Sequence, residues 1–215
     1  MFSRRPTGGA DWDTVADKVI DILRKFVTGE LPPIQFEQQL YARVDEFETF
    51  LERDPHLDHA NYVDGSTFQF LIACRFDELG GVLDAQGAIC DYFDCNNYEY
   101  QKDKSVSELY DLILSASPRW LDPNHSYVQE QILVDAGLRT GKELKSWLRE
   151  ELQKHYRCAS KPPRWIQDAS WPHGKEAPMV FLGQFSVNNY FHDTASVYVF
   201  YDEATCGTET LIQCM

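Results

Sequence analysis

The last quarter of the chain constrains the fold most, because a loop rich in tryptophan and proline runs into three strand-like segments. The loop reads KPPRWIQDASWP over residues 161–172, and PMVFLGQFSV, ASVYVFYD and TLIQC follow at residues 178–187, 195–202 and 210–214. Apolar residues alternate along the first two segments, which is typical of β-strands, and NNYFHD and TCG supply turn residues. We therefore predict a small antiparallel β-meander. Trp165 and Trp171 anchor its loop, since each can bury about 150 to 250 Å².

Helical patterns dominate the chain before this loop. Asp11 or Asp13 can cap a helix with apolar spacings of three and four, and Gly29 stands where a terminating glycine belongs. Pro32 and Pro33 open a second helix, which continues to residue 52 and carries on one apolar side Phe36, Leu40, Val44, Phe47 and Leu51. Further helices are predicted over residues 82–93, 105–117, 127–136 and 140–156. Residues 68–76 are apolar on both sides, which fits a buried helix or a strand, and we favour the helix.

Three local signals refine this pattern. The pair Gly80 and Gly81 predicts a break before the helix at residues 82–93, and Ser105 with Glu108 forms a capping-box pattern. The step KPP at residues 161–163 cannot continue a helix, because each proline removes an amide donor. We therefore predict an α+β protein in which an acidic, mostly helical region, residues 1–160, packs on the β-meander of residues 161–215, as one continuous globule.

The acidic charge lies mainly in the first half. The net charge is −14; residues 1–100 hold 19 Asp and Glu against 8 Lys and Arg, and residues 101–215 hold 15 against 12. Such a field repels phosphate backbones and anionic lipids, so we expect no nucleic-acid or membrane partner, and it attracts a basic protein. Solubility alone is the alternative reason for the charge.

The six cysteines and the N-terminus indicate the compartment. The cysteines are irregularly spaced with no C-x-x-C pair, which predicts reduced thiols and no zinc site. The N-terminal segment lacks the apolar run of a signal peptide, and no segment reaches the roughly 18 apolar residues of a membrane span. We expect a cytoplasmic protein.

Three groups of residues suggest chemistry. His56 and His59, with Asp54 and Asp58 nearby, have the spacing of two metal ligands but lack a third. Cys158 with His155 suggests a thiol nucleophile and its base, and His192 with Asp193 suggests a base and its orienting group. Each has a simpler reading as solvated loop or buried filler. No phosphate-binding loop, G-x-S-x-G or H-E-x-x-H motif occurs. We therefore expect a binding protein rather than an enzyme, with no cofactor and no metal.

The residues of both halves resemble a bacterial family. ELKSWLREELQKHYRC, SKPPRWIQ, PMVFLGQ, VYVFYD and TLIQ, between residues 120 and 213, are similar to immunity proteins of polymorphic, contact-dependent or type VI toxin systems. The segment VIDILRKFVTGELPPIQFEQQLY at residues 19–41 resembles the opening of small immunity domains. The W-P step followed by P-x-x-F-L-x-Q resembles YwqG-like domains, which implies a structural motif without known chemistry. Its residues here are Trp165, Trp171, Pro172 and Gln184.

The resemblance implies a cytoplasmic protein that binds one cognate toxin domain and occludes its active site. Acidic residues of the second helix could then replace substrate phosphates of a basic toxin. These candidate toxin-binding residues are Asp45, Glu46, Glu48, Glu52 and Asp54. Their alternative role is a solvated helix face. Two other functions stay open: a small intracellular enzyme with a cysteine-histidine site, and an interaction module without a toxin. The free edge of the meander also leaves a homodimer open.

Overall fold

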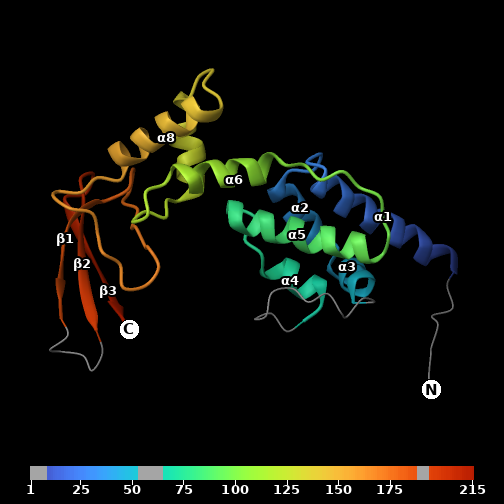
Figure 1. Ribbon diagram of the computed structural model, residues 1–215. Helices are drawn as coiled ribbons and strands as arrows, with labels where there is room; N and C mark the ends of the chain where they lie inside the picture. Colours follow the sequence, from blue (N-terminus) through green and yellow to red (C-terminus); the bar gives the residue numbers. More distant parts are fainter. Residues whose placement is uncertain (1–8, 53–64, 188–193) are drawn as a thin grey trace. The chain divides into compact units, whose positions relative to one another are not determined.

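The chain folds into helices followed by a three-stranded antiparallel sheet, which confirms the predicted α+β class (Figure 1). The computed structural model describes residues 9–52, 65–187 and 194–215, with side chains from residue 14 onward. Two compact units divide the chain, unit 1 at Met1–Leu109 and unit 2 at Tyr110–Met215. Within the described ranges, no helix is long and apolar enough to cross a membrane.

Unit 1 is built from helices. They are α1 (Gly9–Val27), α2 (Pro33–Ala42), α3 (Val44–Leu51), α4 (Thr67–Ala73), α5 (Leu79–Cys95) and the first turn of α6 (Ser105–Ala116). α1 is already helical before Asp11 and Asp13, so neither is its cap. Gly29 has a φ of +79°, which confirms it as the residue that ends α1. A Cβ at Gly29 would lie 2.8 Å from Oδ2 of Asp103, so the close approach of that side chain also requires glycine.

The single helix predicted from Pro32 to residue 52 is wrong, because the chain breaks at Arg43. Arg43 has φ −132° and separates α2 from α3, and its side chain bonds Gln39 on one helix and Glu46 on the other. The apolar spacing continues across the break, so periodicity alone does not reveal it. Val44, which the pattern assigned to the buried side, is exposed.

The glycine break predicted before α5 is also wrong. Gly80 and Gly81 lie inside the first turn of α5, which begins at Leu79. A Cβ at Gly81 would lie 2.1 Å from the carbonyl oxygen of Arg75, so glycine here lets the helix approach the preceding loop. The apolar segment before it forms α4, as predicted, and Ser66 caps this helix by accepting a hydrogen bond from the amide of Gln69.

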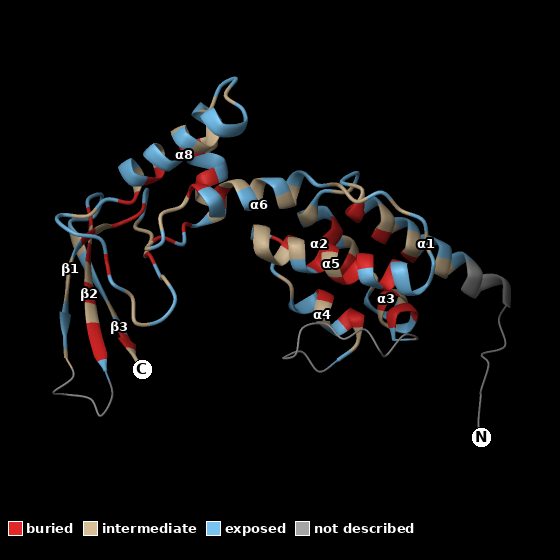
Figure 2. Cartoon of the chain, in the orientation of Figure 1, coloured by how far each residue is buried: buried red, intermediate tan, exposed pale blue. Residues whose placement is uncertain are grey.

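Aromatic rings fill the core of unit 1, which Figure 2 shows in red. The rings of Phe26 and Phe36 stack at 4.1 Å, and Phe76 meets both edge-on. Phe50 of α3 meets Tyr92 of α5 at 5.8 Å. Burying each such side chain stabilises the fold by about 1.5 to 3 kcal/mol, so α1, α2, α3 and α5 are held together chiefly by these rings.

Unit 2 begins with most of α6 and continues with short helices. They are α7 (His125–Tyr127), the π-helical turn η1 (Val128–Ile132), the 3-10 turn η2 (Leu133–Asp135) and α8 (Gly141–His155). The predicted helix at residues 127–136 is therefore three turns of different type. Thr140 stands at the N-cap position of α8, but its side chain makes no capping hydrogen bond. Ser105 is the first residue of α6 rather than its cap, and the carboxylate of Asp103 accepts the Ser105 amide at 3.0 Å instead.

The predicted meander is confirmed. Strands β1 (Val180–Ser186), β2 (Ala195–Asp202) and β3 (Gly207–Cys214) form an antiparallel sheet in the order β1-β2-β3, with a bulge between Phe181 and Gly183. β2 buries alternate residues on one face, which is the face covered by the tryptophan loop. The side chains buried on that face are Ser196, Tyr198, Phe200 and Asp202.

The domain boundary predicted near residue 160 differs from the division between the two units. α8 belongs to the same unit as the sheet, and its residues Leu148 and Leu152 are buried. Tyr156, just after α8, is 1% exposed and meets the ring of Trp171 at 5.7 Å. α8 ends at His155, before the prolines at residues 162 and 163, and the chain that follows it stays in the same unit as the sheet. One globule for the whole chain stays a prediction.

Candidate functional site

Two glutamines attach the tryptophan loop to the sheet. The side-chain oxygen of Gln184 accepts the Arg164 amide at 2.6 Å, and its nitrogen donates to the Arg164 carbonyl at 3.2 Å. The Gln213 side-chain oxygen accepts the amides of Ile166 and Gln167 at 3.0 and 3.1 Å, and its nitrogen donates to the Asp168 carbonyl at 2.9 Å. These amide groups satisfy loop backbone that has no strand partner, as a neighbouring strand would.

Both tryptophans of this loop donate hydrogen bonds to backbone carbonyls. Trp165 donates its indole N–H to the Trp120 carbonyl at 2.8 Å and lies 4.6 Å from the ring of Tyr198. Trp171 is buried and donates to the Met179 carbonyl at 2.8 Å, while the carbonyl of Pro172 accepts the Met179 amide at 3.1 Å. Trp165, Trp171 and Pro172 thus belong to the loop, and Gln184 of β1 bonds to it. Gln213 and Tyr198 were not predicted to hold the loop, although a glutamine in each of two apolar strands was the available signal.

The acidic candidate residues lie on α3. Asp45 and Glu52 are exposed and Glu48 is half-buried, and the three are spaced at i, i+3 and i+7, so they share one face of the helix. Among the described residues none of these three forms a salt bridge, whereas Glu46 pairs with Arg43 at 3.3 Å. The opposite side of α3 carries the buried side chains Phe47, Phe50 and Leu51. Asp54 lies outside the described residues.

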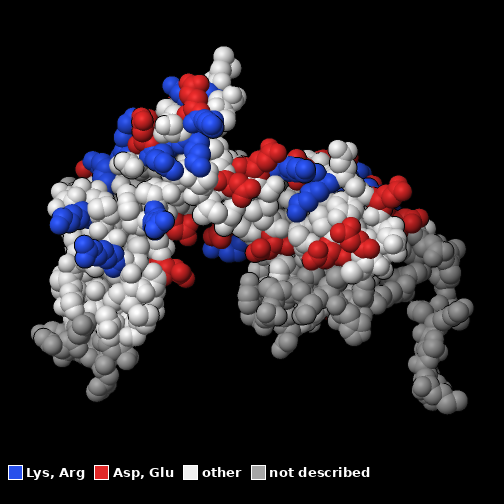
Figure 3. Space-filling model, in the orientation of Figure 1, with Lys and Arg blue, Asp and Glu red and all other residues white. Residues whose placement is uncertain are grey.

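Acidic side chains also lie on the surface of the other helices of unit 1. Figure 3 shows Asp and Glu side chains over the visible face of this unit, with a small group of Lys and Arg among them. Lys18, Lys25 and Arg43 line a surface pocket of about 340 Å³ between α1 and α2, but Lys25 is paired with Asp21 at 2.7 Å. The positive charge of this pocket is therefore partly neutralised by an acidic residue of its own lining.

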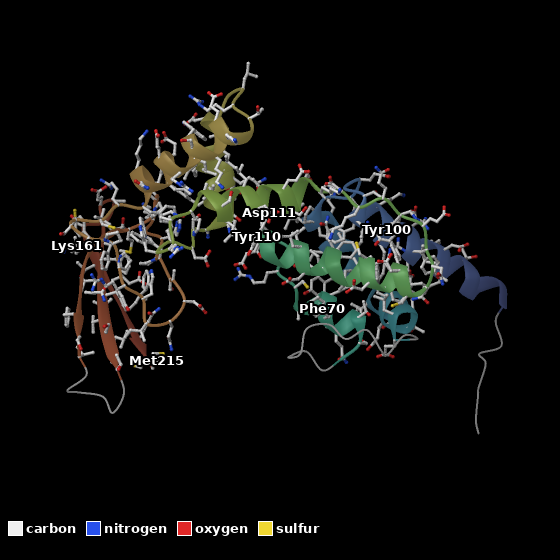
Figure 4. The ribbon with its side chains drawn as sticks, viewed as in Figure 1. Phe70, Tyr100, Tyr110, Asp111, Lys161 and Met215 are labelled. Carbon is white, nitrogen blue, oxygen red and sulfur yellow. The ribbon has the colours of Figure 1, made fainter. Side chains whose placement is uncertain are left out.

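A second pocket lies at the edge of the sheet. It has a volume of about 410 Å³ and is lined by Lys161, Arg164 and the β-bulge at Gly183. Figure 4 shows Lys161 at the end of the strands where the loop begins, and Met215 at their other end. The two cations could bind a carboxylate, but their side chains are exposed and solvated, which makes such binding weak.

The proposed thiol site lacks an activated nucleophile. Burial raises the pKa of the Cys158 thiol, so the thiolate is disfavoured at neutral pH. His155 Nδ1 lies 2.8 Å from the hydroxyl of Tyr127, and no described contact joins His155 to Cys158. The backbone of Cys158 instead forms a bridge with Phe181 of β1. A structural role accounts for both residues.

Tyrosine and histidine side chains form a small network beside this thiol. Tyr156 accepts the Asn124 amide at 3.1 Å, and its hydroxyl lies 3.3 Å from Nε2 of His173. Burial lowers the pKa of His173 below its ordinary value of 6.5, and the ring of Tyr127 lies 5.1 Å away. The network therefore favours a neutral imidazole at neutral pH.

The remaining candidates, His56, His59, Asp58, His192 and Asp193, lie outside the described residues. Within the described part of the chain, no group of three or more His, Cys, Asp or Glu is placed to hold a metal ion.

Comparison of the chain with protein-family models, curated proteins and solved structures finds no match.

Proposed function

We propose that this chain is an immunity protein that binds a cognate bacterial toxin domain in the cytoplasm and neutralises it by occluding its active site. The resemblance of residues 19–41 and 120–213 to immunity proteins supports this function. The observation that carries it is the row of carboxylates on α3, where Asp45, Glu48 and Glu52 share one face and lack salt bridges to described cations.

The net negative charge of unit 1 adds to the attraction that this row exerts on a basic partner. Residues 1–109 hold 21 Asp and Glu and 10 Lys and Arg, a net charge of −11, whereas residues 110–215 hold 13 and 10, a net charge of −3. An acidic surface of this size attracts a basic partner from a distance and repels acidic ones. On a toxin that binds nucleic acid, carboxylates of α3 would occupy positions that otherwise hold phosphate groups.

An immunity protein must also bind tightly, because a small free fraction of a toxin enzyme is lethal. A nanomolar dissociation constant corresponds to about −12 kcal/mol. Exposed charges alone do not supply this energy, since an isolated surface ion pair contributes about 0 to 1 kcal/mol. The acidic row would steer the toxin, and buried contacts next to the row would hold it.

Co-expression with the neighbouring gene tests this function. The C-terminal domain of a large protein encoded beside this chain is expressed with and without this chain, and cell survival is measured. Complex formation is then measured at 0.05 and 0.5 M salt. We expect rescue and a complex that weakens as salt rises. Absence of a neighbouring toxin gene, or death despite good expression of this chain, would refute the proposal.

Charge-neutralising variants then show which acidic residues attract the toxin. Neutralising the row with Asp45→Asn, Glu48→Gln and Glu52→Gln should slow association and reduce its salt dependence. The matched control neutralises three other exposed acids of the same unit, Asp17 on α1 and Asp84 and Asp91 on α5. Equal effects of the two sets would assign the attraction to net charge rather than to α3.

A further inference from the structure

Unit 1 exposes large hydrophobic side chains in one region. Among its described residues, Tyr41 is 55% exposed, Ile34 46%, Ile72 38% and Val44 37%, and no other large hydrophobic side chain there is exposed. They come from α2, the first residue of α3 and the end of α4. We call these four residues the apolar patch. Single exposed hydrophobic residues are common, but a group of them marks an interaction surface.

Their geometry places them together. Ile34 and Tyr41 are seven residues apart on α2, so they project from the same face, opposite the buried Phe36 and Leu40. The hydroxyl of Tyr41 lies 3.4 Å from the carbonyl oxygen of Ile72, so the ends of α2 and α4 touch. Val44 follows Tyr41 by three residues, just beyond the break at Arg43.

The acidic row borders the apolar patch. Val44 is the neighbour of Asp45 and lies one helical turn from Glu48, so an apolar side chain adjoins acidic ones at the start of α3. Strong protein interfaces have this composition, with an aromatic or aliphatic centre that becomes desolvated and a polar rim that excludes water. Tyrosine is among the residues most often found at such centres.

We infer that the apolar patch is the centre of the toxin-binding surface and that Asp45 and Glu48 form its rim. This inference rests on the proposed immunity function. The partner it fits is a toxin domain whose basic surface surrounds an apolar depression, into which the ring of Tyr41 inserts. Charge complementarity selects this partner, because the rim carries carboxylates without described salt bridges.

Binding measurements with the neighbouring toxin domain test the inference. Dissociation constants are measured for the full chain and for Tyr41→Ala, Tyr41→Phe and Ile34→Ala at 0.15 and 0.5 M salt. We expect Tyr41→Ala to weaken binding about thirtyfold at both salt concentrations, as loss of a hot-spot aromatic typically does. Tyr41→Phe should keep most of the affinity, because the ring supplies the contact. Leu138→Ala is the matched control, since Leu138 is a fully exposed apolar residue of unit 2.

The outcomes separate the inference from the proposed function. If the unmodified chain binds and rescues but Tyr41→Ala and Ile34→Ala bind equally well, the patch is not the centre and immunity stands. If the unmodified chain neither binds nor rescues, both fail. Thermal unfolding of each variant checks its fold, and Ile34→Ala replaces Tyr41→Ala if the latter unfolds. Concentration-dependent self-association that Tyr41→Ala abolishes would assign the patch to a second copy and overturn the inference.

Discussion

Replacing Gln213 by leucine should destabilise unit 2 by about 2 kcal/mol. Gln213 is 7% exposed and makes three hydrogen bonds to the loop backbone, at Ile166, Gln167 and Asp168. A net contribution of about 1 kcal/mol for each bond gives about 3 kcal/mol. Gln167 and Asp168 are exposed, so water replaces part of this loss. Leucine keeps the volume of the side chain, so the effect reports the hydrogen bonds rather than a cavity.

Urea unfolding followed by tryptophan fluorescence measures this change, because Trp120, Trp165 and Trp171 lie in the affected layer. With a slope of about 1 to 3 kcal/mol per molar urea, the midpoint should fall by about 1 M. The control is Gln153→Leu, an exposed glutamine on α8, which should leave the midpoint unchanged. A loss below about 0.5 kcal/mol for Gln213→Leu would refute the assignment of Gln213 as a substitute for a strand partner.

Three further predictions follow from local geometry. Burial lowers the pKa of His173, while its value in the unfolded chain stays near 6.5. Unit 2 should therefore keep its full stability above pH 6.5 and lose stability as the pH falls below that value. The difference between the melting temperatures at pH 7.5 and pH 5 should be smaller in His173→Gln than in the unmodified chain. Gly81→Ala should destabilise unit 1, since its Cβ would meet backbone at 2.1 Å, whereas Gly80→Ala has open space and should stabilise α5 by up to about 1 kcal/mol in chemical denaturation. Burial raises the pKa of Cys74 to about 11, so iodoacetamide at pH 8 should modify it far more slowly than the exposed Cys95, as read by mass spectrometry; equal rates would contradict the burial.

The strands could be predicted because their signal is local. Alternation along residues 195–202 matches the alternating burial of β2, and the turn residues fall between β2 and β3. Gly29 was predictable for the same reason, since a helix that ends in a positive φ favours glycine whatever it packs against.

The breaks between helices could not be predicted in this way. The apolar spacing from Phe36 to Leu51 fits one continuous helix, yet Arg43 leaves helical geometry and bonds to both neighbours. Gly81 is a helix breaker by propensity, but contact with the Arg75 backbone determines its place inside α5. Both outcomes depend on contacts that the apolar pattern does not carry and that outweigh local preferences of about 1 kcal/mol.

The division into two units could not be predicted from the sequence for a related reason. α8 does stop before the prolines at residues 162 and 163, but a local stop says nothing about what the helix packs on. Tyr156 is buried against Trp171 and bonds the Asn124 amide, so residues on both sides of the stop share one layer. A boundary requires few contacts across it, and this property is visible only in the folded chain.

Part of the candidate surface could likewise be predicted from the sequence, and the rest depends on the fold. Acidic residues at i, i+3 and i+7 on α3 follow from spacing, but spacing also assigned Val44 to the core, and nothing in the sequence separates Tyr41 from a core aromatic. The break at Arg43 makes the difference, because it exposes Val44 beside Asp45 and leaves Tyr41 next to Ile72. Charge alone would suit a protein that is acidic only for solubility. The exposed apolar side chains beside the acidic row lower solubility and favour binding, so Tyr41→Ala tests the proposed surface more directly than any change of charge.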